Sequence, residues 1–277
     1  MRVMTWNVQG RLGQWERRQN AISASISAAA PDLVLLQESW VEPNGHTQAA
    51  LLAEEQGFHA HTAAELAGFD AYPSAPYWVV NAILSRWPLR PVRAVPLHDE
   101  NGKPTWRHAL IVSVERPGAE GGPVLAVGTH LEHGVERSLT RQAQMEHLLG
   151  EVATALGPRE SWRDNLPAVV AGDFNAVPDS EELRRATGLS SPFVAEFVLV
   201  DAWDACGSTD RGATWSSENP LVPRRAVHPN RRLDYITTTA PRQRGRGSFE
   251  WCRLSGCDAI DGVQPSDHYA VLAEVNL

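Results

Sequence analysis

Short apolar runs alternate with segments of helical periodicity along most of the chain. The runs are rich in β-branched residues and predict strands at residues 3–6, 33–36, 82–84, 109–114, 124–128, 168–171, 233–237 and 270–275. Strands that alternate with helical segments in this way are typical of an α/β protein. The pattern therefore predicts a sheet-based fold with helices covering the sheets.

Two segments show helical spacing clearly. In the first, Ile22, Ile26 and Ala29 recur at intervals of four and three residues. The second carries a stripe that ends before Gly157 and Pro158 and consists of Met145, Leu148, Leu149, Val152 and Leu156. Spacing of this kind places the apolar side chains on one face, so each helix is expected to cover a sheet.

Proline and glycine are scattered through turns and do not gather into a linker, and we find no low-complexity tract and no repeat. A single domain over residues 1–277 is the simplest expectation. Residues 43–82 and 208–231 have the weakest periodicity and are predicted to be long irregular loops. Because such loops often shape access to an active site, substrate choice is expected to depend on them.

Polar residues follow four of the predicted strands, at the next position or one position further. These residues are Asn7, Glu38, His130 and Asp173. Each alone is more simply a turn, a helix cap or an ordinary histidine, but the carboxyl ends of strands in α/β sheets are where ligand sites collect. Together their chemistry is coherent, since carboxylate and amide oxygens suit Mg²⁺ and histidines suit a phosphoryl transition state.

The charge balance argues against a general attraction to polyanions. With 25 basic and 33 acidic residues the formal net charge is −8, so nucleic acid or an anionic membrane would have to be met locally. Residues 224–253 are the one strongly basic stretch and contain eight arginines. This stretch has two interpretations at similar odds, a solvated loop and a phosphate-facing patch.

Three cysteines form an odd count without a metal-type pair, which favours reduced thiols and a cytoplasmic location. The N-terminus has no charged region followed by an apolar segment, and no apolar run approaches bilayer length. We therefore expect no stable membrane insertion and see no sign of an obligate protein partner.

Five sequence blocks, in order, resemble those of the endonuclease/exonuclease/phosphatase superfamily. They are Thr5-Trp6-Asn7, Leu36-Gln37-Glu38, Gly172-Asp173-Phe174-Asn175, Arg232-Leu233-Asp234-Tyr235-Ile236 and Pro265-Ser266-Asp267-His268. Any one block is weak evidence, but the five cover nearly the whole chain. The resemblance implies a four-layer α/β/β/α sandwich, with two central mixed sheets, flanking helices and an active site where the sheets meet at one edge.

The resemblance also implies roles for individual residues. Glu38 would be the principal metal ligand, with Asn7 beside it and Asp267 completing the metal environment. His268 would contact the scissile phosphate and be oriented by Asp234. Asp173 would position or deprotonate the attacking water, and Asn175 and His130 would steady the phosphoryl oxygens. The implied cofactor is Mg²⁺ or Mn²⁺.

The segment Thr129-His130-Leu131-Glu132 is similar to the branch of the superfamily that contains sphingomyelinases and tyrosyl-DNA phosphodiesterases. Trp215 and Arg231 are candidate substrate-binding residues, Trp215 by stacking on a flat group. Ordinary burial of Trp215 is the simpler alternative, since ten tryptophans cannot all be stacking platforms.

The leading hypothesis is a metal-dependent phosphodiesterase that acts on nucleic-acid ends or nucleotide-like diesters. The second is a lipid or inositol phosphate hydrolase, for which residues 71–80, with Tyr72, Tyr77 and Trp78, would be the membrane-docking loop. The third is a non-catalytic binding module on the same fold. It is disfavoured because every position of the expected constellation holds a chemically competent residue.

Overall fold

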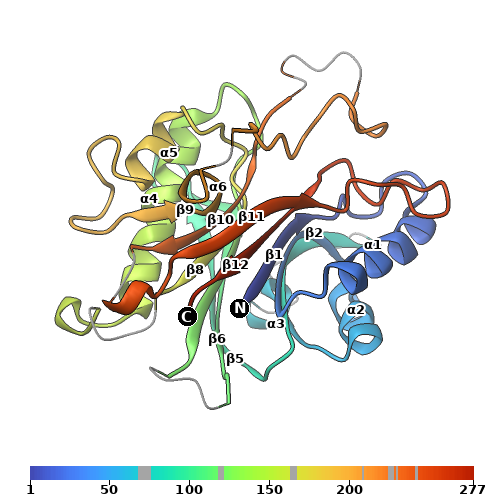
Figure 1. Ribbon diagram of the computed structural model, residues 1–277, viewed down its shortest axis with the longest axis horizontal. Helices are drawn as coiled ribbons and strands as arrows, with labels where there is room; N and C mark the ends of the chain where they lie inside the picture. The colour runs from blue at the N-terminus through green and yellow to red at the C-terminus, as the bar shows by residue number, and fades with distance from the viewer. Residues whose placement is uncertain are drawn as a thin grey trace.

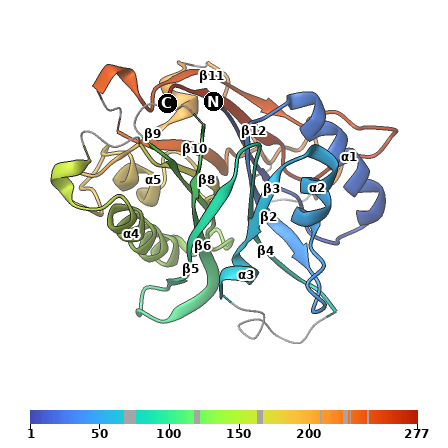
Figure 2. The same cartoon turned by 90° about the horizontal axis from the view of Figure 1, so that it is seen from below.

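The computed structural model describes residues 1–67, 76–117, 122–162, 167–207, 209–223, 228, 230–240 and 243–277. Two six-stranded sheets form its centre, with helices on the outer faces of both (Figures 1 and 2). The predicted four-layer α/β/β/α arrangement is confirmed.

The first sheet has the strand order β11-β12-β1-β2-β4-β3. Its strands are β1 (Arg2–Asn7), β2 (Leu33–Val41), β3 (His59–Thr62), β4 (Trp78–Ser85), β11 (Phe249–Ser255) and β12 (Ala270–Val275). β1 and β2 are parallel and the other pairs are antiparallel, so the sheet is mixed. The N-terminal strand therefore pairs with the C-terminal one, and both ends of the chain lie close together (Figure 1).

The second sheet has the order β5-β6-β7-β8-β10-β9. Its strands are β5 (Leu89–His98), β6 (Pro104–Val114), β7 (Val124–His130), β8 (Val169–Asp173), β9 (Leu199–Asp201) and β10 (Asp234–Thr239). Here β7 and β8 are the parallel pair. The two sheets thus repeat one plan, each with a parallel pair near its middle.

The helices flank the sheets as their apolar stripes predict. They are α1 (Trp15–Ala29), α2 (Gln48–Gln56), α3 (Ala63–Ala67), α4 (Ser138–Ala155), α5 (Glu181–Ala186) and α6 (Ala202–Ala205), with short 3₁₀ turns at Arg159–Ser161 and Gln243–Gly245. Figure 2 shows α1 and α2 on one outer side and α4 on the other. None of the described helices is long and apolar enough to cross a bilayer.

Three apolar layers follow from this arrangement. Alternate residues of the strands point to opposite faces, so Val3 packs between the sheets while Met4 packs on the outer face beneath α1. The stripe on α4 that includes Met145 and Leu148 covers the second sheet. Burial on both faces explains why the central strands are almost continuously apolar.

The prediction of long irregular loops was wrong for part of the range 43–82. This range contains α2, β3 and α3. The hydroxyl of Thr47 accepts a hydrogen bond from the amide of Ala50 at 3.0 Å, which caps α2. The weak periodicity arises because α2 is short and buries mainly alanine and a single leucine, Leu52.

Candidate active site

The predicted site residues converge at the edge where the two sheets meet. Every one of them except Asp234 lines a single cavity of about 420 Å³. β1 and β2 contribute from the first sheet, and β7 and β8 contribute from the second. Residues from positions 7 to 268 are therefore neighbours in space.

Glu38 reaches this cavity because of an irregularity in β2. The expected strand end at Leu36 is not a strand end, since β2 continues to Val41. Its pairing with β4 shifts register between Leu36 and Ser39, and Glu38 adopts a positive φ of 56°. A bulge of this kind redirects a side chain, and a non-glycine residue at positive φ is held there by its surroundings.

Gly172 brings Asp173 level with His130. The parallel register of β7 and β8 pairs these two residues directly. A Cβ atom on Gly172 would lie 1.9 Å from the carbonyl oxygen of Thr129, so no side chain fits between the strands. The glycine before Asp173 is therefore required by the close approach of the two strands.

His268 lies between two buried carboxylates. Its Nδ1 is 2.8 Å from Oδ2 of Asp234, and its Nε2 is 3.9 Å from Oδ2 of Asp173. Burial by itself would lower the pKa of His268, but the two carboxylates outweigh it and hold this pKa well above the usual value. The ring is thus a buried cation, fixed in orientation by Asp234.

The pKa of Asp173 is also raised, but here burial is the main cause. Burial, reinforced by the charge of Asp234, raises the pKa of Asp173 to about 7. Its carboxylate accepts hydrogen bonds from the amide side chain of Asn7 at 3.1 Å and from the backbone amide of Asn175 at 2.9 Å. A carboxylate with a pKa near neutrality can exchange a proton with water at physiological pH.

His130 and Asn175 form the wall beside Asp173. The Nδ2 atom of Asn175 lies 3.0 Å from Nε2 of His130 and donates to the carbonyl of Leu131 at 3.1 Å. Burial first, and then the nearby charge of Arg107, keep the pKa of His130 well below its usual value. His130 is therefore a neutral ring, in contrast to His268.

An oxygen-rich set faces the cavity from the first sheet. Asn7 donates to Oε1 of Glu38 at 3.2 Å, and Asp267 lies near enough for its charge to act on Glu38. Burial is the main reason that the pKa of Glu38 is raised, and Asp267 adds to the effect. Two carboxylates and an amide that crowd one polar cavity fit a divalent cation of the Mg²⁺ type, which would offset their repulsion.

A second group also has metal-ligand geometry. One potential ligand atom from each of Asp173, Asp234 and His268 lies within 4.8 Å of the others, which makes this the one such group among the described residues. Nδ1 of His268 and Oδ2 of Asp234 are already hydrogen-bonded to each other at 2.8 Å, and Mg²⁺ prefers oxygen ligands to an imidazole nitrogen. The set around Glu38 is therefore the better candidate for a hard cation.

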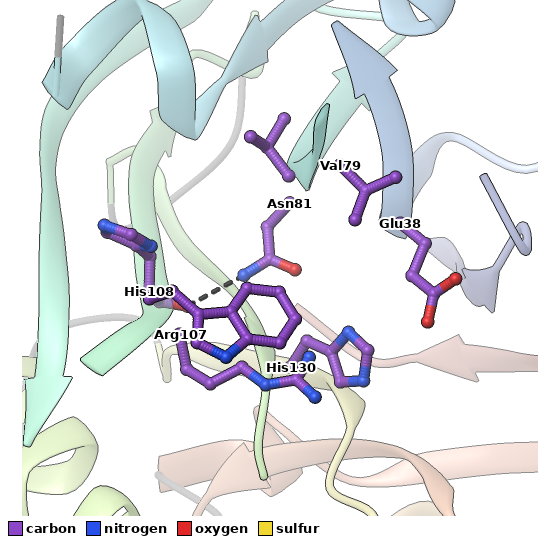
Figure 3. Close-up of a pocket in the computed structure, with 8 residues that line it drawn as sticks. Glu38, Val79, Asn81, Arg107, His108 and His130 are labelled. Carbon is purple, nitrogen blue, oxygen red and sulfur yellow. Dashed lines mark hydrogen bonds between the residues drawn. The ribbon is translucent and has the colours of Figure 1, made fainter. Parts of the chain in front are cut away.

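Arg107 is a site residue that the sequence analysis did not identify. It lies within β6, is 3% exposed and lines the same cavity, where its Nε and Nη1 atoms have no hydrogen-bond partner. Figure 3 shows a smaller pocket that shares Glu38, Arg107 and His130 with this cavity. The available signal was weak, because Arg107 lies before the predicted strand at residues 109–114 and does not follow the carboxyl end of a strand.

Trp215 and Arg231 lie together at the cavity. They pair through their backbones, and the guanidinium of Arg231 lies 4.7 Å from the centre of the Trp215 ring. Other arginines of the basic stretch 224–253 are used differently: Arg232 is buried in an ion pair with Asp201, and Arg253 stacks on Trp251 from β11. Arg224, Arg225 and Arg242 lie outside the described residues.

Comparison with solved structures identifies the same fold. Truncated TDP2 from Caenorhabditis elegans has a TM-score of 0.71 at 22% identity, with 100% of this chain and 97% of that chain covered. The human Nocturnin catalytic domain with bound sulfate has a TM-score of 0.68 at 22% identity, covering 99% and 93%.

One curated protein gives a local sequence match. Protein angel from Drosophila melanogaster is 31% identical over 88 residues, a match that spans 29% of this chain and 23% of that protein. A sequence model of the Endonuclease/Exonuclease/phosphatase family matches residues 4–268, which include every predicted site residue. The chain belongs to the endonuclease/exonuclease/phosphatase family.

Proposed function

We propose that this protein is a divalent-metal-dependent phosphodiesterase that cleaves nucleic-acid ends or nucleotide-like diesters by in-line attack of water. One observation carries the proposal. An oxygen-rich set of Asn7, Glu38 and Asp267 lines the same cavity as His268, whose ring is hydrogen-bonded from behind to Asp234. Phosphoryl transfer needs a positioned nucleophile and compensation of negative charge on the phosphoryl oxygens, and these groups supply both.

Asp173 is the proposed base. Its pKa of about 7 suits it to accept a proton from the attacking water, and its hydrogen bonds to Asn7 and Asn175 fix its orientation. His268, held positively charged by Asp234, would donate a hydrogen bond to a phosphoryl oxygen. The amide of Asn175 and the ring of His130 would bind the remaining oxygens.

Glu38, Asn7 and Asp267 are the proposed ligands of Mg²⁺ or Mn²⁺. The bound ion would supply Lewis-acid stabilisation of charge on the phosphoryl group. Arg107, buried against the same cavity with two unpartnered nitrogens, adds a fixed positive charge from the protein itself. We propose that residues 1–277 act as one catalytic domain, since both ends of the chain contribute to this site.

Two observations favour a nucleic-acid substrate over a lipid. TDP2 from D. rerio, which shares this fold at a TM-score of 0.71 and 18% identity, has been solved with a single-strand DNA product. In addition, Trp215 and Arg231 provide a flat surface and a positive charge beside the phosphate position. Half of the candidate membrane-docking segment 71–80, residues 71–75 with Tyr72, lies outside the described residues, and Tyr77 lies against the guanidinium of Arg11, 5.3 Å from it.

A substrate panel tests the proposal. Single-stranded DNA, an abasic duplex, a 5′-tyrosyl oligonucleotide, sphingomyelin and an inositol polyphosphate would each be incubated with Mg²⁺, Mn²⁺ or a chelator. We expect metal-dependent cleavage of at least one nucleic-acid substrate. Cleavage restricted to sphingomyelin or the inositol phosphate would replace the proposed substrate class, and no cleavage of any substrate with metal would support a non-catalytic module.

A further inference from the structure

Two loops from opposite ends of the chain carry the proposed metal ligands. Residues 8–12 follow Asn7 at the end of β1, and residues 263–267 lead into Asp267 and His268 before β12. The first loop is also tied to the strand of Glu38, because the amide of Val8 donates to the carbonyl of Gln37 at 2.9 Å. The relative position of these loops therefore sets the distances between the three proposed ligands.

A single guanidinium binds both loops. Nη1 of Arg18, on α1, donates to the carbonyls of Val8 at 2.9 Å and Pro265 at 3.0 Å. Its other nitrogens donate to the carbonyls of Gln9, Gly10 and Leu12 at distances between 2.8 and 3.2 Å. Arg18 thus bridges two segments that are about 250 residues apart in sequence and joins them to one helix.

The environment of Arg18 is unusual for a buried charge. The side chain is 3% exposed, yet no ion pair joins it to a carboxylate among the residues that the structure describes. Asp267 and Glu38 act on it only at longer range. Burying a charge is costly unless hydrogen bonds compensate it. Five backbone carbonyls compensate the guanidinium of Arg18, and they can accept its hydrogen bonds only if both loops are held in place.

Two other hydrogen bonds also join β1 to the loop before β12, but they do not reach residues 9–12. The hydroxyl of Ser266 donates to the carbonyl of Asn7 at 2.6 Å, and the indole of Trp6 donates to the carbonyl of His268 at 2.9 Å. Both join the strand β1 to the C-terminal loop, whereas the contacts of Arg18 also fix residues 9–12. A guanidinium group suits the binding of two loops because its five N–H donors are spread over a rigid plane, whereas the three donors of a lysine ammonium group all come from one nitrogen.

We propose that Arg18 is a positioning residue of the metal site, holding the loops of Asn7 and Asp267 in the relative geometry that a divalent cation requires. The inference rests on the proposed metal site. Groups that orient the ligands of a metal commonly contribute about 10- to 100-fold in affinity when they are altered.

The test compares Arg18→Lys with Arg2→Lys. The second variant controls for loss of a guanidinium that binds backbone carbonyls, because Arg2 donates to the carbonyls of Ala29 and Ala30 at the other end of α1, away from the cavity; Arg2 is more exposed than Arg18 and also pairs with Glu274. Both substitutions keep the positive charge and replace the planar guanidinium with an ammonium group. Mn²⁺ affinity would be measured by electron paramagnetic resonance without substrate, and the thermal midpoint and hydrogen–deuterium exchange would be measured without metal.

We expect Arg18→Lys to weaken Mn²⁺ binding by about 10-fold or more and to speed amide exchange in residues 8–12 and 263–268. Arg2→Lys should leave both unchanged. Mn²⁺ affinity within twofold of wild type, or exchange no faster than in the control, would overturn the proposal even if the thermal midpoint fell.

If Arg18→Lys does not fold, Arg18→Gln is measured in its place with the same criteria, because glutamine keeps two N–H donors. The same measurements separate this proposal from the proposed function. If the wild-type protein binds no Mn²⁺, both the proposed metal site and the role of Arg18 are overturned. If the wild-type protein binds Mn²⁺ and the Arg18 variants bind it equally well, only the role of Arg18 is overturned.

Discussion

Asp173→Asn should stabilise the metal-free protein at alkaline pH, although it should abolish activity. The carboxyl group is 1% exposed, and burial together with Asp234 raises its pKa from the ordinary 3.8 to about 7. Ionising this group in the folded protein is therefore unfavourable. The asparagine side chain has almost the same shape and cannot ionise, so the comparison isolates the charge.

The sign and the size follow from proton linkage. A carboxyl group whose folded pKa is raised stabilises the protein fully below its unfolded pKa, and this contribution is lost as the pH rises through the folded value. The pH window therefore runs from about 4 to 7. A change from 3.8 to about 7 corresponds to about 4 kcal/mol.

The assay is urea unfolding of both proteins in a chelating buffer at pH 4.5 and pH 8. Asparagine cannot accept both hydrogen bonds that Asp173 receives, and this loss of about 1 kcal/mol is the same at either pH. The advantage of Asp173→Asn in unfolding free energy should therefore grow by about 3–4 kcal/mol between the two conditions. A difference that does not change with pH would refute the assignment of a raised pKa to Asp173.

Asp201→Asn is the matched control. Asp201 is also a buried aspartate, 6% exposed, and burial raises its pKa too, but unlike Asp173 it forms an ion pair with Arg232. Removing its charge leaves a buried guanidinium less well satisfied, so this variant should lose about 1–3 kcal/mol at pH 8. Stabilisation by both variants would indicate a general effect of removing acidic charge from a protein with a net charge of −8.

Three further predictions concern catalysis. Glu38→Gln, which keeps the shape but removes a negative charge, should raise the Mn²⁺ concentration needed for half-maximal hydrolysis of bis-p-nitrophenyl phosphate by about 10-fold or more, and an unchanged metal dependence would remove Glu38 from the ligand set. Asp234→Asn should lower kcat by about 100-fold or more, because His268 loses the partner that holds its charge and orientation; a kcat within threefold of wild type would contradict this role. Arg231→Ala should weaken binding of a single-stranded oligonucleotide, measured by fluorescence anisotropy, more than it alters KM for the small chromogenic ester, and equal effects on both would remove Arg231 from recognition of the extended substrate.

The strands that position the site were predictable because they are buried on both faces. Such strands read as continuous apolar runs, and the polar residue that ends each one stands out, as His130 and Asp173 do. Edge strands were missed. β5 is only partly buried, contains Pro91 and Pro96 and shifts register beside both, so its sequence lacks a regular period.

Features of the site that depend on tertiary packing could not be predicted. The bulge that directs Glu38 carries no glycine or other turn residue, so its positive φ is imposed by the surrounding sheet. Arg107 and Arg18 lie within a strand and a helix, where a single charged residue is usually a solvent-facing position. Only the structure shows that both are buried next to the proposed metal site.

The most direct test of the central claim is a crystal structure of the protein soaked with Mn²⁺, with the ion located by its anomalous scattering. The proposed function predicts an ion in the cavity at the edge of the two sheets, bound directly by a carboxylate oxygen of Glu38, with Asp234 still hydrogen-bonded to His268. An ion held instead by Asp173, Asp234 and His268, or no ion in this cavity at saturating Mn²⁺, would contradict the assignment of the metal ligands and the catalytic roles that depend on it.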